Sequence, residues 1–417
     1  MSLCRGLAIS TDDTFAKQTG QTTPRSERPR HAKRVLLFHM GGVLGHLNRV
    51  LALAEEIDAA GHEAILATSD GGLPIFQALK PGVRRIEAYD DPGLKDARAL
   101  LTSTAGGRRG DRSNLHGMGP QDSQGKSEIA RQMARTAAAD RALIERIEPD
   151  AMVVDHRFTG WPADRGLRDR TFHISALLGL PSLHKRVTGR LPYPLQGGRL
   201  LVPGIREIEC WHRKDPSAAQ PGRVALCGLF RWQGWARLRG SQRALPRTQA
   251  LFFFGSTGDG ARARAALGEA AEGWLNHRWV GNAWCGAVDA AREPAVDLES
   301  GLTGAELLIC HGGHGTVMEA LFYERPVIVI PSNPEQLEIG HRLEKMGLGL
   351  LVRQRVETIT RAGLAELIAS VSENARMQRR VKRYSALLRQ KADGAKHAAA
   401  IVLEHIGANL SGSKTAK

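Results

Sequence analysis

The sequence has little of several features, and each shortage argues against a class of protein. No apolar run approaches the ~20 residues that a membrane-spanning helix needs, and the first residues lack the apolar core of a secretion signal. The five cysteines are scattered without a Cys-x-x-Cys pair, which argues against a disulfide framework and a zinc site. Aromatic residues make up 5% of the chain and do not interleave with basic ones, so no nucleic-acid partner is predicted. A cytoplasmic protein without a bound metal is expected.

The chain does have length, glycine and positive charge. Its 417 residues allow about two domains with a core each, and 46 glycines suit an α/β protein with many strand-to-helix turns. The net charge is +15, and the arginines are spread along the chain. We interpret this charge as a solvated basic surface, and keep peripheral contact with an anionic membrane as an alternative.

Three regions are predicted. Residues 1–33 are polar and show no sustained period, as a disordered tail does. Residues 34–238 and 239–417 each open with an apolar strand, a glycine-rich turn and a helix-forming segment, which is typical of Rossmann-like α/β domains. Residues 105–125 are rich in glycine, serine and arginine and predict a loop, either a lid over a ligand or a plain insertion.

The first half begins with a βαβ unit. The elements expected there are a strand at 35–40, a turn at 41–45, a helix at 46–60 and a strand at 63–68. A further apolar strand ends at Asp155. Because the carboxyl ends of parallel strands share one edge of a sheet, Asp155 is expected at the same edge as His46, which starts the helix.

The rest of the chain is less uniform. Residues after Asp155 are expected to be helical to about Leu178, whereas 191–220 is punctuated by proline and glycine and gives no assignment. Residues 223–228 predict the last strand of the first half, and 373–405 predict one or two basic helices.

The most informative stretch follows the strand Leu307–Cys310. Residues 311–316 form a glycine-rich turn, and 317–323 have helix-forming spacing. Unpaired N–H groups and the positive end of the helix dipole favour an anion at such a turn, and Thr316 adds a hydroxyl donor. A phosphate group is the natural ligand.

Two further groups extend this site. Glu319 lies about one helical turn beyond Thr316, where its carboxylate can accept hydrogen bonds from a ribose diol. Glu335 and Gln336 follow the next strand, which ends at Pro331, and so lie where open α/β sheets bind ligands.

The order His-x-Gly-x-x-Thr-x-x-Glu, Pro-x-x-x-x-Pro and Glu-Gln in these residues resembles the donor signature of GT-B glycosyltransferases of family 1, which includes UDP-glycosyltransferases and antibiotic glycosyltransferases. The resemblance implies two facing Rossmann-like domains with a cleft between them. It assigns Glu319 to the ribose, and Glu335 and Gln336 to the sugar. It also assigns diphosphate or other donor contacts to Gly45, Ser256, Thr257, His311, Gly313, Gly315 and Thr316.

The turn Gly45-His46-Leu47-Asn48-Arg49 resembles the Gly-His-x-Asn-Pro of the same family, with Arg49 where proline is usual. In the family this histidine is the catalytic base and an aspartate orients it, which implies these roles for His46 and Asp155. The chemistry fits, because an imidazole takes a proton at neutral pH when a carboxylate stabilises the imidazolium. His39 and His314 are competing candidates for a site histidine.

The implied reaction is an inverting transfer of a hexose from a UDP- or dTDP-sugar to a hydroxyl of a small-molecule, natural-product or lipid acceptor, without a cofactor. Two departures from the family pattern leave the identity of the donor's nucleobase and of its sugar undecided. Residues 292–295 stand where the family has a tryptophan that stacks on the base, and Glu335 replaces a frequent aspartate. The alternatives are a nucleotide-sugar 2-epimerase on the same fold and a non-catalytic relative that binds a sugar nucleotide.

Overall fold

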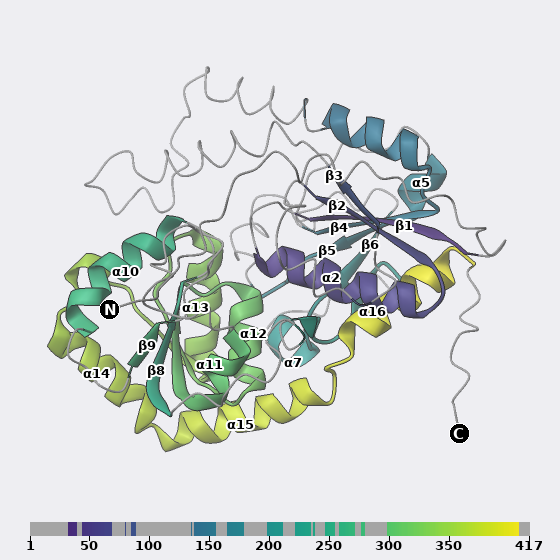
Figure 1. Ribbon diagram of the computed structural model, residues 1–417. Coiled ribbons are helices and arrows are strands. Elements are labelled where there is room, and N and C mark those ends of the chain that lie inside the picture. Colours follow the sequence, from purple (N-terminus) through teal and green to yellow (C-terminus); the bar gives the residue numbers. More distant parts are fainter. Residues whose placement is uncertain are drawn as a thin grey trace, which may run out of the picture.

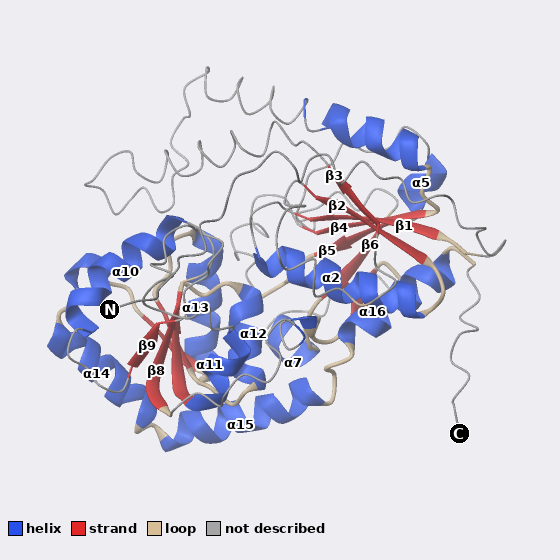
Figure 2. Cartoon of the chain, in the orientation of Figure 1, coloured by secondary structure: helices blue, strands red, loops and turns tan. Residues whose placement is uncertain are grey.

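The computed structural model describes residues 32–39, 44–68, 80, 85–88, 135, 137–155, 165–178, 198–211, 222–234, 237, 247–254, 258–271, 277–279 and 298–407. They form two α/β units, each built on a parallel sheet flanked by helices, as Figures 1 and 2 show. Most of the predicted tail at 1–33 and the whole loop at 105–125 lie outside the described residues. Within the described part, no helix is both long and apolar enough to cross a membrane.

The first sheet has the strand order β3-β2-β1-β4-β5-β6-β7 among its described strands, and all pairs are parallel. Its strands are β1 (Arg34–His39), β2 (Glu63–Thr68), β3 (Arg85–Ala88), β4 (Ala151–Asp155), β5 (Thr171–Ile174), β6 (Arg199–Val202) and β7 (Val224–Leu226). The helices of this unit are α2 (Leu44–Ala59), a helix at 137–147, α5 (Arg165–Asp169) and α7 (Arg206–Glu209). The predicted βαβ unit is thus β1, α2 and β2.

The second sheet has the order β12-β11-β10-β8-β9, again with parallel pairs. Its strands are β8 (Thr248–Phe253), β9 (His277–Trp279), β10 (Ala305–Cys310), β11 (Val327–Val329) and β12 (Gly349–Leu351). The helical elements are α10 (Gly258–Ala271), α11 (Leu298–Gly304), α12 (His314–Phe322), α13 (Pro334–Met346), η4 (Val356–Thr358), α14 (Arg361–Ser372) and α15 (Ala375–Arg389).

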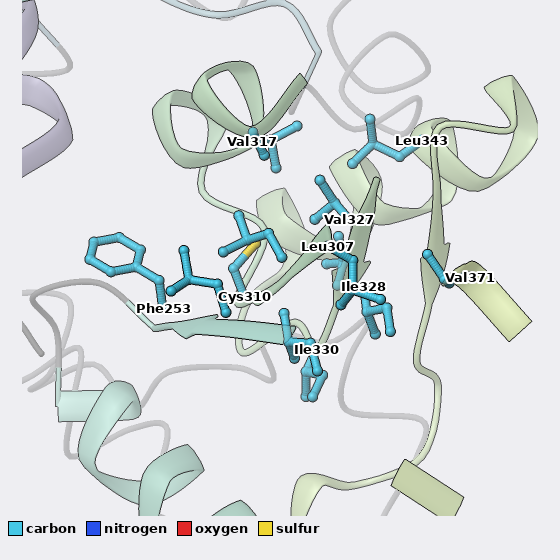
Figure 3. Packing of buried hydrophobic residues seen from close by; sticks show 14 of the residues in the cluster. Phe253, Leu307, Cys310, Val317, Val327, Ile328, Ile330, Leu343 and Val371 are labelled. Atoms are coloured by element: carbon cyan, nitrogen blue, oxygen red, sulfur yellow. The ribbon is translucent and has the colours of Figure 1, made fainter. Parts of the chain in front are cut away.

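The core of the second unit contains residues of both β10 and α12. The strands β8, β10 and β11 carry almost uninterrupted apolar runs because helices cover both faces of a parallel sheet. Figure 3 shows Cys310 and Val317 packed beside Val327 and Ile330, so the end of β10 and the start of α12 are both anchored in this core.

The last helix, α16 (Gly394–His405), returns to the first unit and packs on α2 (Figure 1). Where the chain returns to the first unit, the backbone between α15 and α16 contacts the backbone after β7. Leu229 N donates to Lys391 O at 2.8 Å, and Gly394 N donates to Leu229 O at 3.1 Å. An added Cβ at Gly228, where φ is +100°, would lie 2.5 Å from Lys391 O, so this approach depends on glycine.

One expectation was wrong. The segment after Asp155 is not helical to Leu178, because β5 (Thr171–Ile174) follows the short helix α5 and pairs with β4 and β6. All four of its residues are buried between neighbouring strands, and a short apolar run of this kind has no period that separates strand from helix.

Candidate active site

In each sheet the strand order reverses at one point, and the predicted site residues follow strands at these two points. The reversal lies between β1 and β4 in the first sheet and between β8 and β10 in the second. Open α/β sheets bind ligands outside the carboxyl ends of the strands at such points, because the loops diverge there. The helices that follow β1 and β10, α2 and α12, contact each other across the boundary between the two units (Figure 1).

His46 and Asp155 meet at the first of these points. His46 lies in the first turn of α2, and its Nδ1 is 2.8 Å from Oδ1 of Asp155. The aspartate side chain is 0% exposed and the histidine side chain 16% exposed, so the imidazole stands at the surface of a buried carboxylate. A carboxylate only accepts hydrogen bonds, so Nδ1 donates to Asp155 in the tautomer that carries its hydrogen on Nδ1, and in that tautomer Nε2 has the lone pair that a base needs.

Arg49 belongs to the same cluster. Its Nε lies 2.7 Å from Oδ2 of Asp155 and its Nη2 lies 2.8 Å from Oδ1, which is a two-pronged ion pair. The competing candidate His39 ends β1 and is the strand-register partner of Asp155. It is buried, with Nε2 2.9 Å from Oγ1 of Thr68, as a satisfied core histidine is.

The predicted diphosphate loop leads into α12, which begins at His314 with Gly313 as the N-cap. The first hydrogen bond of the helix runs from Val317 N to Gly313 O at 3.0 Å. The N–H groups of His314, Gly315 and Thr316 precede this bond and have no acceptor inside the helix. They and the helix dipole are the features that the predicted anion site requires.

Glycine shapes this loop. Gly312 has φ +90°, and an added Cβ would lie 2.6 Å from Cγ1 of Val329. A Cβ on Gly313 would lie 2.6 Å from Nε2 of His311. A Cβ on Gly315, in contrast, would meet no described atom within 4 Å. The loop is therefore closed toward the sheet and open above the helix N-terminus, where an anion would lie.

Glu319 is paired with a residue that the sequence did not single out. Nε of Arg231, which follows β7, lies 3.1 and 3.2 Å from the two carboxylate oxygens of Glu319. Burial raises the pKa of Glu319, and the charge and hydrogen bond of Arg231 oppose this shift. The guanidinium also lies over the ring of Phe322, at 4.0 Å from its centroid. Arg231 therefore favours the ionised carboxylate that a ribose diol needs as acceptor.

His314 reaches in the other direction, into the first unit. Its Nε2 lies 2.6 Å from Oε1 of Glu209 in α7, and both side chains are buried. Oε2 of Glu209 accepts from the backbone N–H groups of Leu177 and Leu178 at 2.7 and 2.8 Å. An added Cβ at Gly204 would lie 2.4 Å from Oε1, so glycine makes room for this carboxylate. The pair fastens the start of α12 to the first unit.

The start of α13 carries the residues predicted to hold the sugar. Glu335 is exposed in the first turn, whereas Gln336 is buried. The side-chain oxygen of Gln336 accepts from N and Oγ of Ser332, both at 2.8 Å, and Asn333 caps the helix. The NH2 group of Gln336 is the part that can donate to a sugar hydroxyl.

The remaining predicted residues divide into two groups. Gly45 is exposed, and a Cβ there would meet no described atom within 4 Å. Ser256 and Thr257, and the segment 292–295 at the position of the family's stacking tryptophan, lie outside the described residues.

No sequence pattern selects Glu209 or Arg231. Glu209 lies in the unassigned stretch 191–220, and Arg231 follows the last predicted strand of the first half, so neither belongs to a motif. Arg49 stood out as a departure from the family pattern, but its partner could not be predicted from the sequence. In all three cases the partner is remote in sequence, and only the fold joins the two.

Comparisons with known proteins test the predicted family and fold. Residues 296–398 match the glycosyltransferase family 28 C-terminal domain. The glycosyltransferase of kitacinnamycin has a similar structure over 90% of this chain and 99% of its own, with a TM-score of 0.61 and 16% sequence identity. The chain has the GT-B fold. The predicted fold class, with two facing domains and a cleft, is therefore confirmed.

Sequence relatives point the same way. An uncharacterized UDP-glucosyltransferase of Bacillus subtilis, YojK, is 31% identical over 25% of this chain and 25% of its own length. The chain thus matches a quarter of the length of that relative. A longer match, 25% identical over 72% of this chain and 81% of the relative, is to the UDP-N-acetylglucosamine--N-acetylmuramyl-(pentapeptide) pyrophosphoryl-undecaprenol N-acetylglucosamine transferase of Thermus thermophilus. The predicted resemblance to GT-B glycosyltransferases is confirmed by these matches.

The buried Glu209–His314 pair predicts a stability effect. Glu209→Ala leaves two backbone N–H groups and the ring of His314 without their acceptor, so the free energy of unfolding should fall by about 3 kcal/mol or more. Urea unfolding followed by circular dichroism measures this change. Glu207→Ala, which removes an exposed carboxylate from the same helix, is the control and should have little effect. Equal urea midpoints for the two variants would contradict a stabilising role of the Glu209–His314 pair.

The Arg231–Glu319 pair predicts an effect on nucleotide affinity. Arg231→Met leaves the Glu319 charge uncompensated near the anion site, so the Kd for UDP should rise about tenfold, or about 1.4 kcal/mol. Arg231→Lys should restore part of the affinity, and Arg231→Met in a Glu319→Ala background should add little, because the two act as a unit. Calorimetric titration gives these constants. Additive losses of UDP affinity in the double variant, or tighter UDP binding by Arg231→Met, would contradict this account.

Proposed function

We propose that the protein is an inverting glycosyltransferase that moves a hexose from a UDP- or dTDP-sugar to a hydroxyl group, with His46 and Asp155 as the catalytic dyad. The observation that carries the proposal is the 2.8 Å contact between His46 Nδ1 and Asp155 Oδ1 at a strand-order reversal. It is supported by the contact of α2 with α12, which carries the anion site.

In this proposal Nε2 of His46 takes the proton from the acceptor hydroxyl. The hydroxyl oxygen forms a bond with the anomeric carbon while the bond from that carbon to the diphosphate oxygen breaks, and the diphosphate leaves with the electron pair. Attack from the side opposite the leaving group inverts the configuration. Asp155 stabilises the imidazolium, as a carboxylate next to a general base does.

The leaving diphosphate needs compensation for its growing negative charge. The N–H groups of His314, Gly315 and Thr316 and the helix dipole of α12 supply it from fixed positions, so little reorganisation accompanies the reaction. Glu319 binds the ribose, and Glu335 with the NH2 group of Gln336 binds the sugar. The names of the sequence relatives favour a UDP-sugar as donor, and that of the Thermus thermophilus relative includes a lipid-linked acceptor.

Two measurements test this function. UDP and dTDP are titrated into the protein by calorimetry, and release of nucleotide from UDP-sugars is followed with candidate acceptors. His46→Ala should lower kcat by about 100-fold or more while the Kd for UDP stays the same, because the base does not contact the diphosphate. His341→Ala on α13 is the matched control. Failure of the wild type to bind either nucleotide would overturn the proposal, and binding without turnover would favour a non-catalytic relative.

We also propose peripheral contact with anionic membranes through α15. Its exposed face carries Arg376, Arg379, Lys382 and Arg383, while its apolar side packs into the second core. Such a face attracts anionic lipid by charge alone. Sedimentation with phosphatidylglycerol vesicles should occur at low salt, decline at high salt, and be lost in Arg379→Glu/Arg383→Glu. Equal sedimentation with neutral phosphatidylcholine vesicles would contradict the proposal.

A further inference from the structure

Arg49 is the site residue that the proposed reaction leaves without a role. It stands where the resembling family has proline, and its side chain is only 8% exposed. Its guanidinium binds both oxygens of Asp155, at 2.7 Å from Nε and 2.8 Å from Nη2. A two-pronged contact of this kind fixes the plane of the carboxylate as well as its position.

The same guanidinium also touches the imidazole. Nη2 of Arg49 lies 2.5 Å from Nδ1 of His46, and both groups lie 2.8 Å from Oδ1 of Asp155. A ring nitrogen has a single in-plane position, so Nδ1 either donates to Asp155 or accepts from Arg49. In the first case Nε2 carries no hydrogen and has the lone pair that a base needs, and in the second case Nε2 carries the hydrogen and cannot act as a base.

The charge of the Arg49 guanidinium acts in the same direction as its competition for Nδ1. An isolated carboxylate beside an imidazole stabilises the protonated ring, whereas a carboxylate paired with a guanidinium has much of its charge compensated. The charged side chains whose contacts with His46 are described above are Asp155 from β4 and Arg49 from α2. Of the helices packed on α2, α12 begins with His314, which bonds Glu209, and α16 carries His397, which contacts a backbone carbonyl.

We propose that Arg49 is a positioning residue that makes the pair into a triad. It holds Asp155 in one orientation, and by compensating the aspartate charge and competing for Nδ1 it limits how strongly His46 retains a proton. This inference rests on the proposed function, in which His46 is the base.

The test is the dependence of kcat/KM on pH in wild type and Arg49→Met. Without the guanidinium the acidic limb of the profile should move to higher pH by about one unit, and activity lost at neutral pH should return at alkaline pH. Arg141→Met, which removes an exposed arginine from the helix at 137–147, is the matched control. If kcat/KM of Arg49→Met fell by the same factor at every pH, Arg49 would be only structural, and the proposal would be overturned.

A second variant covers the case in which Arg49→Met does not fold. Lysine keeps the charge but has one nitrogen, so Arg49→Lys cannot bind both oxygens of Asp155. It should leave the acidic limb in place and lower kcat, with the Kd for UDP unchanged. A wild-type kcat in Arg49→Lys would overturn the proposal.

A third measurement separates this inference from the proposed function. Nitrogen-15 NMR of the histidine rings, with His46→Ala used for assignment, follows protonation of His46 without turnover. Its signals should titrate at higher pH in Arg49→Met than in wild type, even if no sugar is transferred. Identical titrations in the two proteins would overturn the role of Arg49, whereas absent turnover with shifted titrations would overturn only the proposed function.

Discussion

The fully buried carboxylate of Asp155 is the constraint on which the site depends. A carboxylate out of contact with water requires hydrogen-bond donors and a compensating charge, and it finds them in His46 and Arg49 on the first turns of α2. The parallel pairing of β1 with β4 brings these turns to the end of β4. The geometry of the proposed base therefore follows from the strand order of the first sheet.

A second buried carboxylate, Glu209, links the two units. It is satisfied by two backbone N–H groups of its own unit and by His314 at the start of α12. Arg342 on α13 adds a contact to the backbone oxygen of Leu177 at 3.2 Å. His314 and Arg342 of the second unit thus contact two neighbouring groups of the first, Glu209 and Leu177, so the predicted anion site and the proposed dyad lie on opposite sides of the same boundary.

Much of this arrangement could be predicted from the sequence, because it depends on local patterns. The apolar runs before His46, Asp155 and His311 mark the strands, and the glycines after them mark the turns. Parallel strands then require that the two residues of the dyad share an edge, although they are 109 positions apart in the chain.

The parts that could not be predicted depend on long-range partners. Glu209 comes from a proline- and glycine-punctuated stretch without a period, and Arg231 finds Glu319 at a separation of 88 residues. A buried ion pair leaves no periodic signal in either segment. The short strand β5 was missed for a related reason, since four buried residues cannot reveal a period.

The structure of the protein in complex with UDP tests the central claim most directly. The account predicts the diphosphate on the N–H groups of residues 314–316, the ribose at Glu319, and the ring of His46 across the cleft with Nδ1 on Asp155 and Nε2 facing the ligand. UDP bound away from the start of α12, or a His46 ring turned so that Nε2 contacts Asp155, would contradict it.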